Sequence, residues 1–277
     1  MQRTVSSSLT ADVLSPVDLE LQVAVARADG LDVDERLEVT LDGAPLQPTE
    51  LDDPGPSTPS RVHVLRCGPG RLEVRYDARV TGRAAPTPVT GLDATVFRRP
   101  SRYGDSDRLA ALAVAQLGPG VREDGEGEDP AVVRDRVVAF VRERIAYVSG
   151  SSRGTDSAVD SLLMGAGVCR DHAHLVVALL RALGVPARLV SVYAPGLAPM
   201  DFHAVTEVLV GERWTLVDST GLAPRPAMVR IATGRDAADT AFLTTYGGEL
   251  RLTGMTVLAV VDGDLPVDPT SDDVYLG

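Results

Sequence analysis

The sequence predicts an α+β protein, with an all-β N-terminal domain over residues 1–90 and a domain of mixed helices and strands over residues 91–277. Apolar and polar residues alternate from Val17 to Ala26, which is the period of a half-buried strand. Beyond residue 105 the apolar residues recur at helical spacing, and strand-like runs return only after residue 186. A length of 277 residues favours two domains over one.

The first ninety residues are predicted to form strands divided by turns. After the strand that begins at Val17, further strands are predicted at residues 36–41, 61–66 and 71–80. Sequences rich in Gly, Pro or Asp predict turns at residues 42–43, 53–56 and 68–70. Residues 81–91 contain two prolines and two glycines, so we expect the linker between the two domains there.

Four helices are predicted between residues 105 and 183. One begins at Asp129-Pro130, an N-cap followed by proline at the first helical position, and continues as an apolar stripe to Ile145. The other three cover residues 106–117, 157–164 and 169–183. Strands are predicted after them at residues 187–193, 203–210, 214–217 and 255–261.

The net charge argues against nucleic acid or an anionic membrane as the main partner. The chain holds 27 basic and 39 acidic residues, a formal charge of −12, which disfavours binding to a phosphate backbone. The basic residues are all arginine, and asparagine is absent. The sequence therefore excludes both a Schiff-base lysine and a Cys-His-Asn triad.

Cysteine use and hydropathy indicate the compartment. Cys67 and Cys169 are the only cysteines, so a disulfide framework is not expected. Residues 1–10 lack the apolar stretch of a secretory signal, and no run approaches the roughly 20 apolar residues of a membrane helix. We therefore expect a cytoplasmic protein without a membrane partner.

Cys169 is the candidate nucleophile because it opens a predicted helix. A helix N-terminus carries about half a positive charge and free N–H groups, which favour a thiolate and can receive an oxyanion. Ala173, Val176 and Leu180 share the stripe of Cys169, so the sulfur is expected to face the protein. The alternative is a small buried hydrophobe, a common role of free cysteine.

The general base must be one of four histidines. His63 lies in the β-rich region. His172 and His174 share the helix of Cys169, and side chains on one helix point in nearly parallel directions, so neither histidine is well placed to face the sulfur. His203, at the start of a predicted strand, is the candidate that remains. A zinc site is also disfavoured, because His172 and His174 point about 200° apart on a helix.

The third member follows from a predicted hairpin. Residues 211–212 can form a two-residue turn, with glycine first. In that register Asp218 lies on the same sheet face as His203 and diagonal to it, about 7–8 Å away at Cα. A turn of three residues would place Asp218 on the opposite face. The expected task of Asp218 is to fix the tautomer of the imidazole.

Three elements resemble the core of bacterial transglutaminase-like proteins, which are often described as cysteine proteases. They are Gly-Val-Cys-Arg-Asp at residues 167–171, Asp-Phe-His-Ala at 201–204 and Trp-Thr-Leu-Val-Asp at 214–218. The resemblance covers roughly residues 97–242, and the preceding β-rich region resembles the N-terminal domain that these proteins usually carry. It implies a papain-like fold, in which the Cys helix packs on an antiparallel sheet, and a catalytic triad of Cys169, His203 and Asp218.

Two positions depart from the family pattern. The resemblance includes a Ser-Arg-Tyr element at residues 101–103. Many relatives have a cysteine directly after it, where this chain has Gly104. Papain places a glutamine oxyanion donor a few residues before its cysteine, whereas residues 161–164 here are Ser-Leu-Leu-Met. The second oxyanion donor is therefore not identified, and Tyr103 and Tyr147 are candidates for it.

The expected function is thiol-dependent acyl chemistry on an amide of a peptide or protein. Cys169 attacks the carbonyl, His203 shuttles the proton, and a thioester forms. Water as acceptor makes the protein a protease or amidase, which we favour, and an amine makes it a transglutaminase. This chemistry requires no cofactor and no metal. The alternative is a non-catalytic interaction module that retains the fold.

Overall fold

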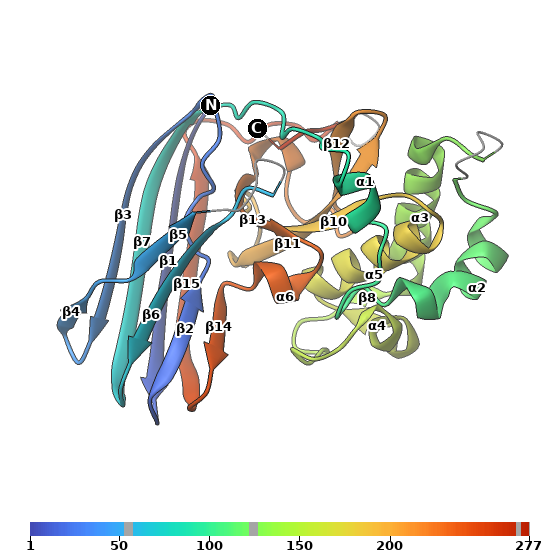
Figure 1. Cartoon of the computed structure of the whole chain (residues 1–277). Helices are drawn as coiled ribbons and strands as arrows, with labels where there is room; N and C mark the ends of the chain where they lie inside the picture. Colours follow the sequence, from blue (N-terminus) through green and yellow to red (C-terminus); the bar gives the residue numbers. More distant parts are fainter. Residues whose placement is uncertain (53–57, 122–126, 270–272, 277) are drawn as a thin grey trace.

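The computed structural model describes residues 1–52, 58–121, 127–269 and 273–276, so the predicted turn at residues 53–56 lies outside the described residues. Its β-rich half contains two antiparallel sheets that share one hydrophobic core (Figure 1). The five-stranded sheet has the order β15-β1-β7-β3-β4, and the four-stranded sheet has the order β14-β2-β6-β5. The strands are β1 (Gln2–Val13), β2 (Val17–Leu21), β3 (Leu31–Leu41), β4 (Ala44–Leu46), β5 (Thr49–Asp52), β6 (Arg61–Cys67), β7 (Gly70–Gly82), β14 (Leu243–Tyr246) and β15 (Leu250–Val261).

Strand β1 was not predicted, although it lies between β15 and β7 in the larger sheet. Its side chains alternate between inward and outward positions over 12 residues. The inward positions include Val5 and Leu9 but also Arg3 and Ser7. Because polar residues hold some of the buried positions, the segment lacks the apolar alternation that reveals a half-buried strand.

The last two strands complete the β-rich half, although the predicted division placed their residues in the second domain. Strand β15 pairs with β1 from Arg3↔Val261 to Val13↔Leu250, and β14 pairs with β2. Val257 is buried in the core of this half. A boundary at residue 90 therefore separates β1 and β2 from strands to which they are hydrogen-bonded, because strand pairing does not follow chain order.

The second half combines helices with a four-stranded antiparallel sheet of order β12-β11-β10-β13, and the α+β class is thereby confirmed. Helix α5 packs on β10 and β11 and is flanked by α2, α3 and α4 (Figure 1). The predicted helices are present, and so are the first three of the four strands predicted after them; the fourth, residues 255–261, lies within β15. The unpredicted elements of this half are α1, β8, β9, β13 and α6. The elements are α1 (Asp93–Val96), α2 (Ser106–Leu117), α3 (Pro130–Arg144), β8 (Ala146–Tyr147), α4 (Ala158–Met164), β9 (Ala166–Gly167), α5 (Cys169–Ala182), β10 (Ala187–Tyr193), β11 (Phe202–Val210), β12 (Arg213–Val217), β13 (Val229–Gly234) and α6 (Ala237–Thr240).

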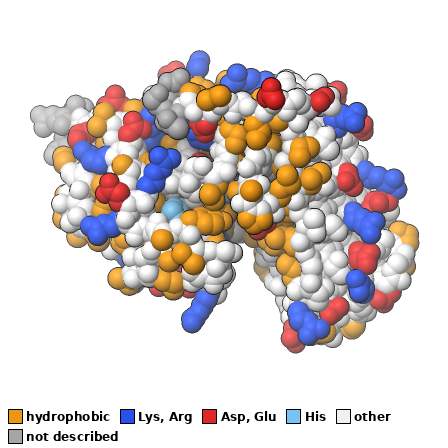
Figure 2. Space-filling model, turned by 180° about the vertical axis from the view of Figure 1, so that it is seen from behind, with side chains coloured by type: hydrophobic (Ala, Val, Ile, Leu, Met, Phe, Trp, Pro, Cys, Tyr) orange, Lys and Arg blue, Asp and Glu red, His pale blue; other side chains and the backbone are white. Residues whose placement is uncertain are grey.

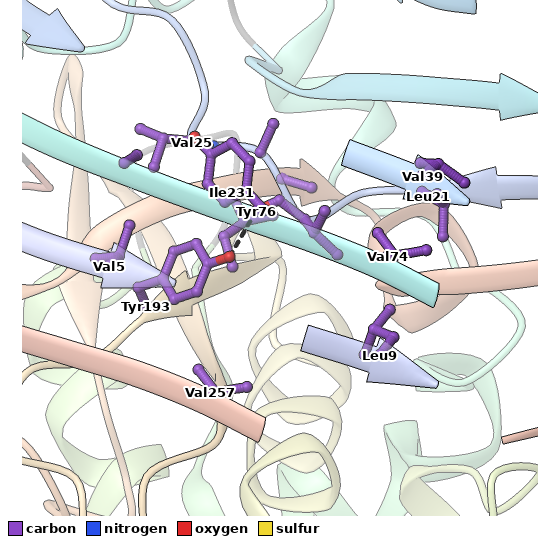
Figure 3. Close-up of a cluster of buried hydrophobic side chains, with 14 of the residues drawn as sticks. Val5, Leu9, Leu21, Val25, Val39, Val74, Tyr76, Tyr193, Ile231 and Val257 are labelled. Atoms are coloured by element: carbon purple, nitrogen blue, oxygen red, sulfur yellow. Dashed lines mark hydrogen bonds between the residues drawn. The ribbon is translucent and has the colours of Figure 1, made fainter. Parts of the chain in front are cut away.

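Tyr193 joins the two halves. Its ring stacks on that of Tyr76, with centroids 6.3 Å apart. Its hydroxyl donates to the Val23 carbonyl at 2.8 Å and lies 3.0 Å from the Ser7 hydroxyl. Figure 3 shows Tyr193 and Ile231 among the buried side chains of the β-rich half. The core is therefore continuous across the predicted domain boundary.

The surface in Figure 2 carries many of its hydrophobic side chains near the middle of the molecule, with charged side chains toward its two ends. Within the described ranges, no helix combines the length and the apolar character needed to cross a membrane.

Candidate active site

Cys169 is the first residue of α5 and is partly exposed. The start of the helix is fixed by Asp171, a fully buried residue whose carboxylate accepts a hydrogen bond from the Val168 N–H at 2.8 Å. Arg170 donates to the other carboxylate oxygen at 3.0 Å. The buried Asp171 carboxylate therefore interacts favourably with the partial positive charge of the first helical turn, as an acidic residue at a helix N-terminus does.

Gly167 makes this close start possible. A Cβ at that position would lie 2.6 Å from the Asp171 Cβ and 3.1 Å from its Oδ2. A side chain would force Asp171 away from the Val168 N–H. The Gly-Val-Cys sequence is thus explained by the approach of the Asp171 side chain to the strand β9 backbone.

The hairpin between β11 and β12 has the predicted register. Val210 pairs with Arg213 and Thr206 with Val217. Gly211 has a φ of 60°, and Glu212 is not among the described residues with positive φ, which matches a type II′ turn with glycine first. The predicted two-residue turn is confirmed.

This register brings His203 and Asp218 together. His203 Nε2 lies 2.8 Å from Asp218 Oδ2, and both side chains are buried. Burial opposes ionisation of Asp218, but hydrogen bonds from His203 and Thr220 outweigh it and lower the pKa of the carboxyl. Because an ionised carboxylate can only accept, the proton in this contact belongs to Nε2.

The remaining ring nitrogen of His203 is left for the thiol. Its Nδ1 atom is buried and meets no nitrogen or oxygen partner among the described residues. Burial disfavours the charged ring, but the hydrogen bond to Asp218 and the neighbouring Cys169, together with the charges of both, raise the pKa of His203 to about 10. The ring therefore lies between Asp218 and Cys169, in surroundings that favour its protonated form.

The structure thus brings together Cys169, His203 and Asp218, the three residues predicted from the sequence. A small void beside them is lined by Cys169, Asp218 and residues of β11 and α5. Among the described residues, no three His, Cys, Asp or Glu side chains gather as a metal site. The arrangement has the parts of an acyl-transfer centre: a cysteine sulfur, an imidazole and a carboxylate that orients the imidazole.

The two candidate oxyanion donors, Tyr147 and Tyr103, have different surroundings. Tyr147 is 45 % exposed; burial and then the charge of Cys169 raise the pKa of its phenol. Tyr103 instead stacks on the buried ring of His174, with centroids 5.2 Å apart. Of the two candidate oxyanion donors, Tyr147 is therefore the one whose phenol is influenced by the charge of Cys169.

His172 lies at the same centre, a position that was not predicted from the sequence. Its Nδ1 is 3.4 Å from the Ser219 hydroxyl, and its ring lies 6.1 Å from that of Tyr147. Burial lowers the pKa of His172, partly offset by the charges of Asp218 and Asp171. No sequence motif identifies His172 as a site residue, because it reaches the site only through the approach of Ser219 to α5.

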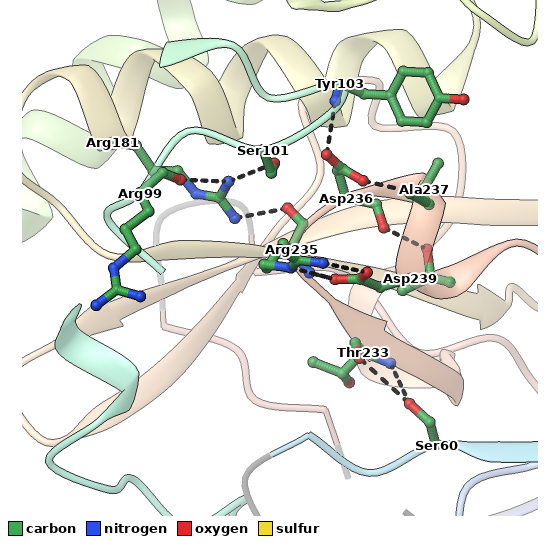
Figure 4. Close-up of polar contacts among 12 residues, drawn as sticks. Ser60, Arg99, Ser101, Tyr103, Arg181, Thr233, Arg235, Asp236, Ala237 and Asp239 are labelled. Carbon is green, nitrogen blue, oxygen red and sulfur yellow. Dashed lines mark hydrogen bonds and ion pairs between the residues drawn. The ribbon is translucent and has the colours of Figure 1, made fainter. Parts of the chain in front are cut away.

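A network of polar contacts holds α5 in position (Figure 4). The Arg181 guanidinium donates to the Arg99 carbonyl, the Ser101 hydroxyl and the Arg235 carbonyl at 3.1, 2.9 and 2.6 Å. Asp236 accepts from the Tyr103 N–H at 2.7 Å. The two stretches around residues 99–103 and 235–239 therefore anchor the helix that carries Cys169.

Comparisons with known proteins agree with this geometry. A family model described as the transglutaminase-like superfamily matches residues 123–219, a span that contains Cys169, His203 and Asp218. A crystal structure from Cytophaga hutchinsonii, described as that of a candidate cysteine protease, is 32% identical, with a TM-score of 0.84 over 96% of this chain and 92% of that chain.

An uncharacterised protein of Mycobacterium leprae (strain TN) is 29% identical over 160 residues. The match covers 53% of this chain and 54% of that protein, so the chain spans about half the length of this curated relative. The family model and the full-length structural relative establish the family. The chain belongs to the transglutaminase-like superfamily.

Proposed function

We propose that this protein is a thiol enzyme that acts on amide bonds, with Cys169 as nucleophile, His203 as proton carrier and Asp218 as the group that orients His203. The observation that carries the proposal is the position of the His203 ring, which is bound to Asp218 through Nε2 and faces Cys169 with the other nitrogen. A cationic imidazole beside the sulfur stabilises negative charge on it.

The proposed reaction has two halves. The Cys169 thiolate, paired with the protonated His203, attacks the carbonyl carbon, and the His203 Nδ1 proton passes to the amine as the C–N bond breaks, which leaves a thioester and a neutral imidazole. In hydrolysis, the neutral His203 then takes a proton from a water molecule as the water oxygen attacks the thioester. The carboxylic acid is released, and the Cys169 thiolate is restored. In transfer, an amine takes the place of that water.

The developing oxyanion requires donors. The first N–H groups of α5 have no partner within the helix, and the N–H of Cys169 is one of them. Tyr147 is the proposed second donor, because its phenol lies near Cys169 and remains 45 % exposed.

Hydrolysis is the favoured outcome. The relative at 32% identity is described as a candidate cysteine protease, and Cys169 is partly open to solvent. Transglutamination requires water to be kept from the thioester, and the partial exposure of Cys169 does not favour that. Peptide or protein amides are the proposed substrates.

A trapping experiment tests the proposal. The protein is incubated with a panel of peptides and peptide carboxamides, with and without a small amine, and Cys169 is examined for an acyl adduct by mass spectrometry. We expect a C169A-sensitive adduct and release of acid or, with the amine, of its amide. The absence of an adduct, together with iodoacetamide labelling of Cys169 no faster than that of buried Cys67, would leave the interaction module as the better explanation.

A further inference from the structure

Residues 218–220 follow the last residue of β12, where the ladder with β11 ends at Thr206↔Val217. Asp218 thus lies one step beyond the pairs that hold the hairpin together. Its carboxylate still needs a fixed position, because Oδ2 contacts His203 while Oδ1 accepts from the Thr220 N–H and hydroxyl at 2.8 and 2.6 Å. The backbone of this segment therefore sets the position of the carboxylate.

Arg142 of α3 holds that backbone. Its Nη2 donates to the Asp218 carbonyl and its Nε to the Ser219 carbonyl, each at 3.0 Å. Both bonds come from one planar guanidinium, so they fix the direction of two successive peptide carbonyls as well as their distance. Among the described residues, Arg142 makes no ion pair with a carboxylate.

Helix α3 is a rigid support for this contact. Val133, Val137 and Val141 are fully buried in the core that α3 shares with α5, and the Asp129 side chain caps its N-terminus. Arg142 follows Val141 directly, so its Cα is fixed by packing. Arg142 also lines a cavity of about 540 Å³ to which Asp218 contributes, so a shorter side chain at this position meets no steric conflict.

We propose that Arg142 is a positioning residue of the active site, which holds the carbonyls of Asp218 and Ser219 so that the Asp218 carboxylate stays directed at His203. The inference rests on the proposed function, since it gives Arg142 an effect on the reactive centre that is transmitted through Asp218. A plain structural link between α3 and the loop would instead affect stability alone.

The test compares the pH profile of iodoacetamide labelling at Cys169 in the wild type, R142M, R142Q and R144M. Methionine keeps the apolar stem and removes all donors, while glutamine keeps one amide donor. Arg144 is the matched control, since it is also exposed, lies two residues along the same helix and packs over the Phe140 ring at 5.1 Å. Thermal unfolding of each variant reports separately on stability.

For R142M we expect labelling at pH 6.5 to slow by at least about fivefold, the order expected for a lost hydrogen bond to a charged donor, with the acid limb of the profile at higher pH. R142Q should show a smaller shift, and R144M should match the wild type. In a D218N background, R142M should add less than about twofold, because two residues acting through one contact are not additive.

Three results would overturn the inference: an unchanged profile in R142M, an equal shift in R144M, or a full additional loss in the D218N background. If R142M is too unstable to label, an R142Q profile identical to the wild type overturns it. Failure of the proposed function gives a different result, in which wild-type Cys169 itself is labelled no faster than Cys67.

Discussion

His203 Nε2 and Asp218 Oδ2 lie 2.8 Å apart because the hairpin that connects their strands turns on two residues. Side chains alternate between the faces of a sheet, so one extra residue in the turn would move every later side chain of β12 to the other face. The sheet face on which Asp218 lies is therefore determined by the turn at Gly211 and Glu212.

Substitution of the three site residues should give graded losses. C169A removes the nucleophile, so acyl adducts should vanish, while folding is nearly unchanged because one small residue replaces another at a helix start. H203A should do almost as much damage, since nothing then carries the proton. D218N should be milder than the roughly 10⁴-fold loss of the analogous serine-triad change, because a thiol is more nucleophilic than a hydroxyl at neutral pH.

The measurement is turnover on one peptide amide, with adduct formation followed in parallel. C67A is the matched control, because Cys67 is buried in the β-rich half and burial raises the pKa of its thiol. C67A should retain the adduct. Turnover in C169A equal to the wild type would refute the assigned nucleophile.

Gly211 should contribute to stability through its backbone conformation alone. Its φ is 60°, and a Cβ there would meet no atom within 4 Å. G211A should therefore lower the free energy of unfolding by about 1 kcal/mol, the cost of a left-handed conformation for a residue with a Cβ. Urea denaturation measures this change.

Gly68 provides the control for that experiment. A Cβ at Gly68 also meets no atom within 4 Å, and its φ is not in the left-handed region. G68A should leave stability unchanged or raise it by up to about 1 kcal/mol, because alanine restricts the unfolded chain. Equal losses in G211A and G68A would show that the hairpin conformation is not the cause.

Much of the site could be predicted because its members depend on local structure. The start of α5 at Cys169 and the register of the β11–β12 hairpin each follow from a short stretch of sequence. A two-residue turn fixes the alignment of its own strands, so His203 and Asp218 could be paired without knowledge of the rest of the fold.

The parts that could not be predicted depend on contacts between distant segments. Strand β1 pairs with β15 across most of the chain, and polar Arg3 and Ser7 occupy inward positions on it. Arg142 contacts the backbone carbonyl groups of Asp218 and Ser219. Because every residue has a backbone carbonyl, such a partner cannot be recognised from the sequence. His172 likewise reaches the site only because Ser219 folds back onto α5.

Gly167 should be intolerant of a side chain. The Cβ of G167A would lie 2.6 Å from the Asp171 Cβ, so Asp171 must move and the hydrogen bond from Val168 is strained. We expect a loss of about 1–3 kcal/mol in the free energy of unfolding, as for other overpacked sites, and slower labelling of Cys169. G154A is the control, since a Cβ at Gly154 comes no closer than 4.0 Å to another residue. Equal unfolding midpoints in the two variants would contradict the packing argument.

His174 should make the protein sensitive to mild acid. The Ala237 N–H donates to His174 Nε2 at 3.1 Å, so the ring is neutral with its proton on Nδ1. Complete burial, only partly offset by the charge of Asp236, lowers the pKa of His174 to about 4, whereas in the unfolded chain it is about 6.5. Between these values the unfolded state binds a proton that the folded state does not, so stability falls as the pH falls from about 6.5 to about 4.

The difference amounts to about 3 kcal/mol over that interval. H174Q supplies the comparison, because its amide oxygen can accept from Ala237 but does not titrate. Urea denaturation at pH 7.5, 6.5, 5.5 and 4.5 should show a steeper loss of stability in the wild type than in H174Q. Burial also lowers the pKa values of His63 and His172, but both residues are present in the two proteins, so their contributions cancel in the difference. Parallel stability curves for the wild type and H174Q would mean that His174 binds a proton as readily in the folded protein as in the unfolded chain, and the prediction would be wrong.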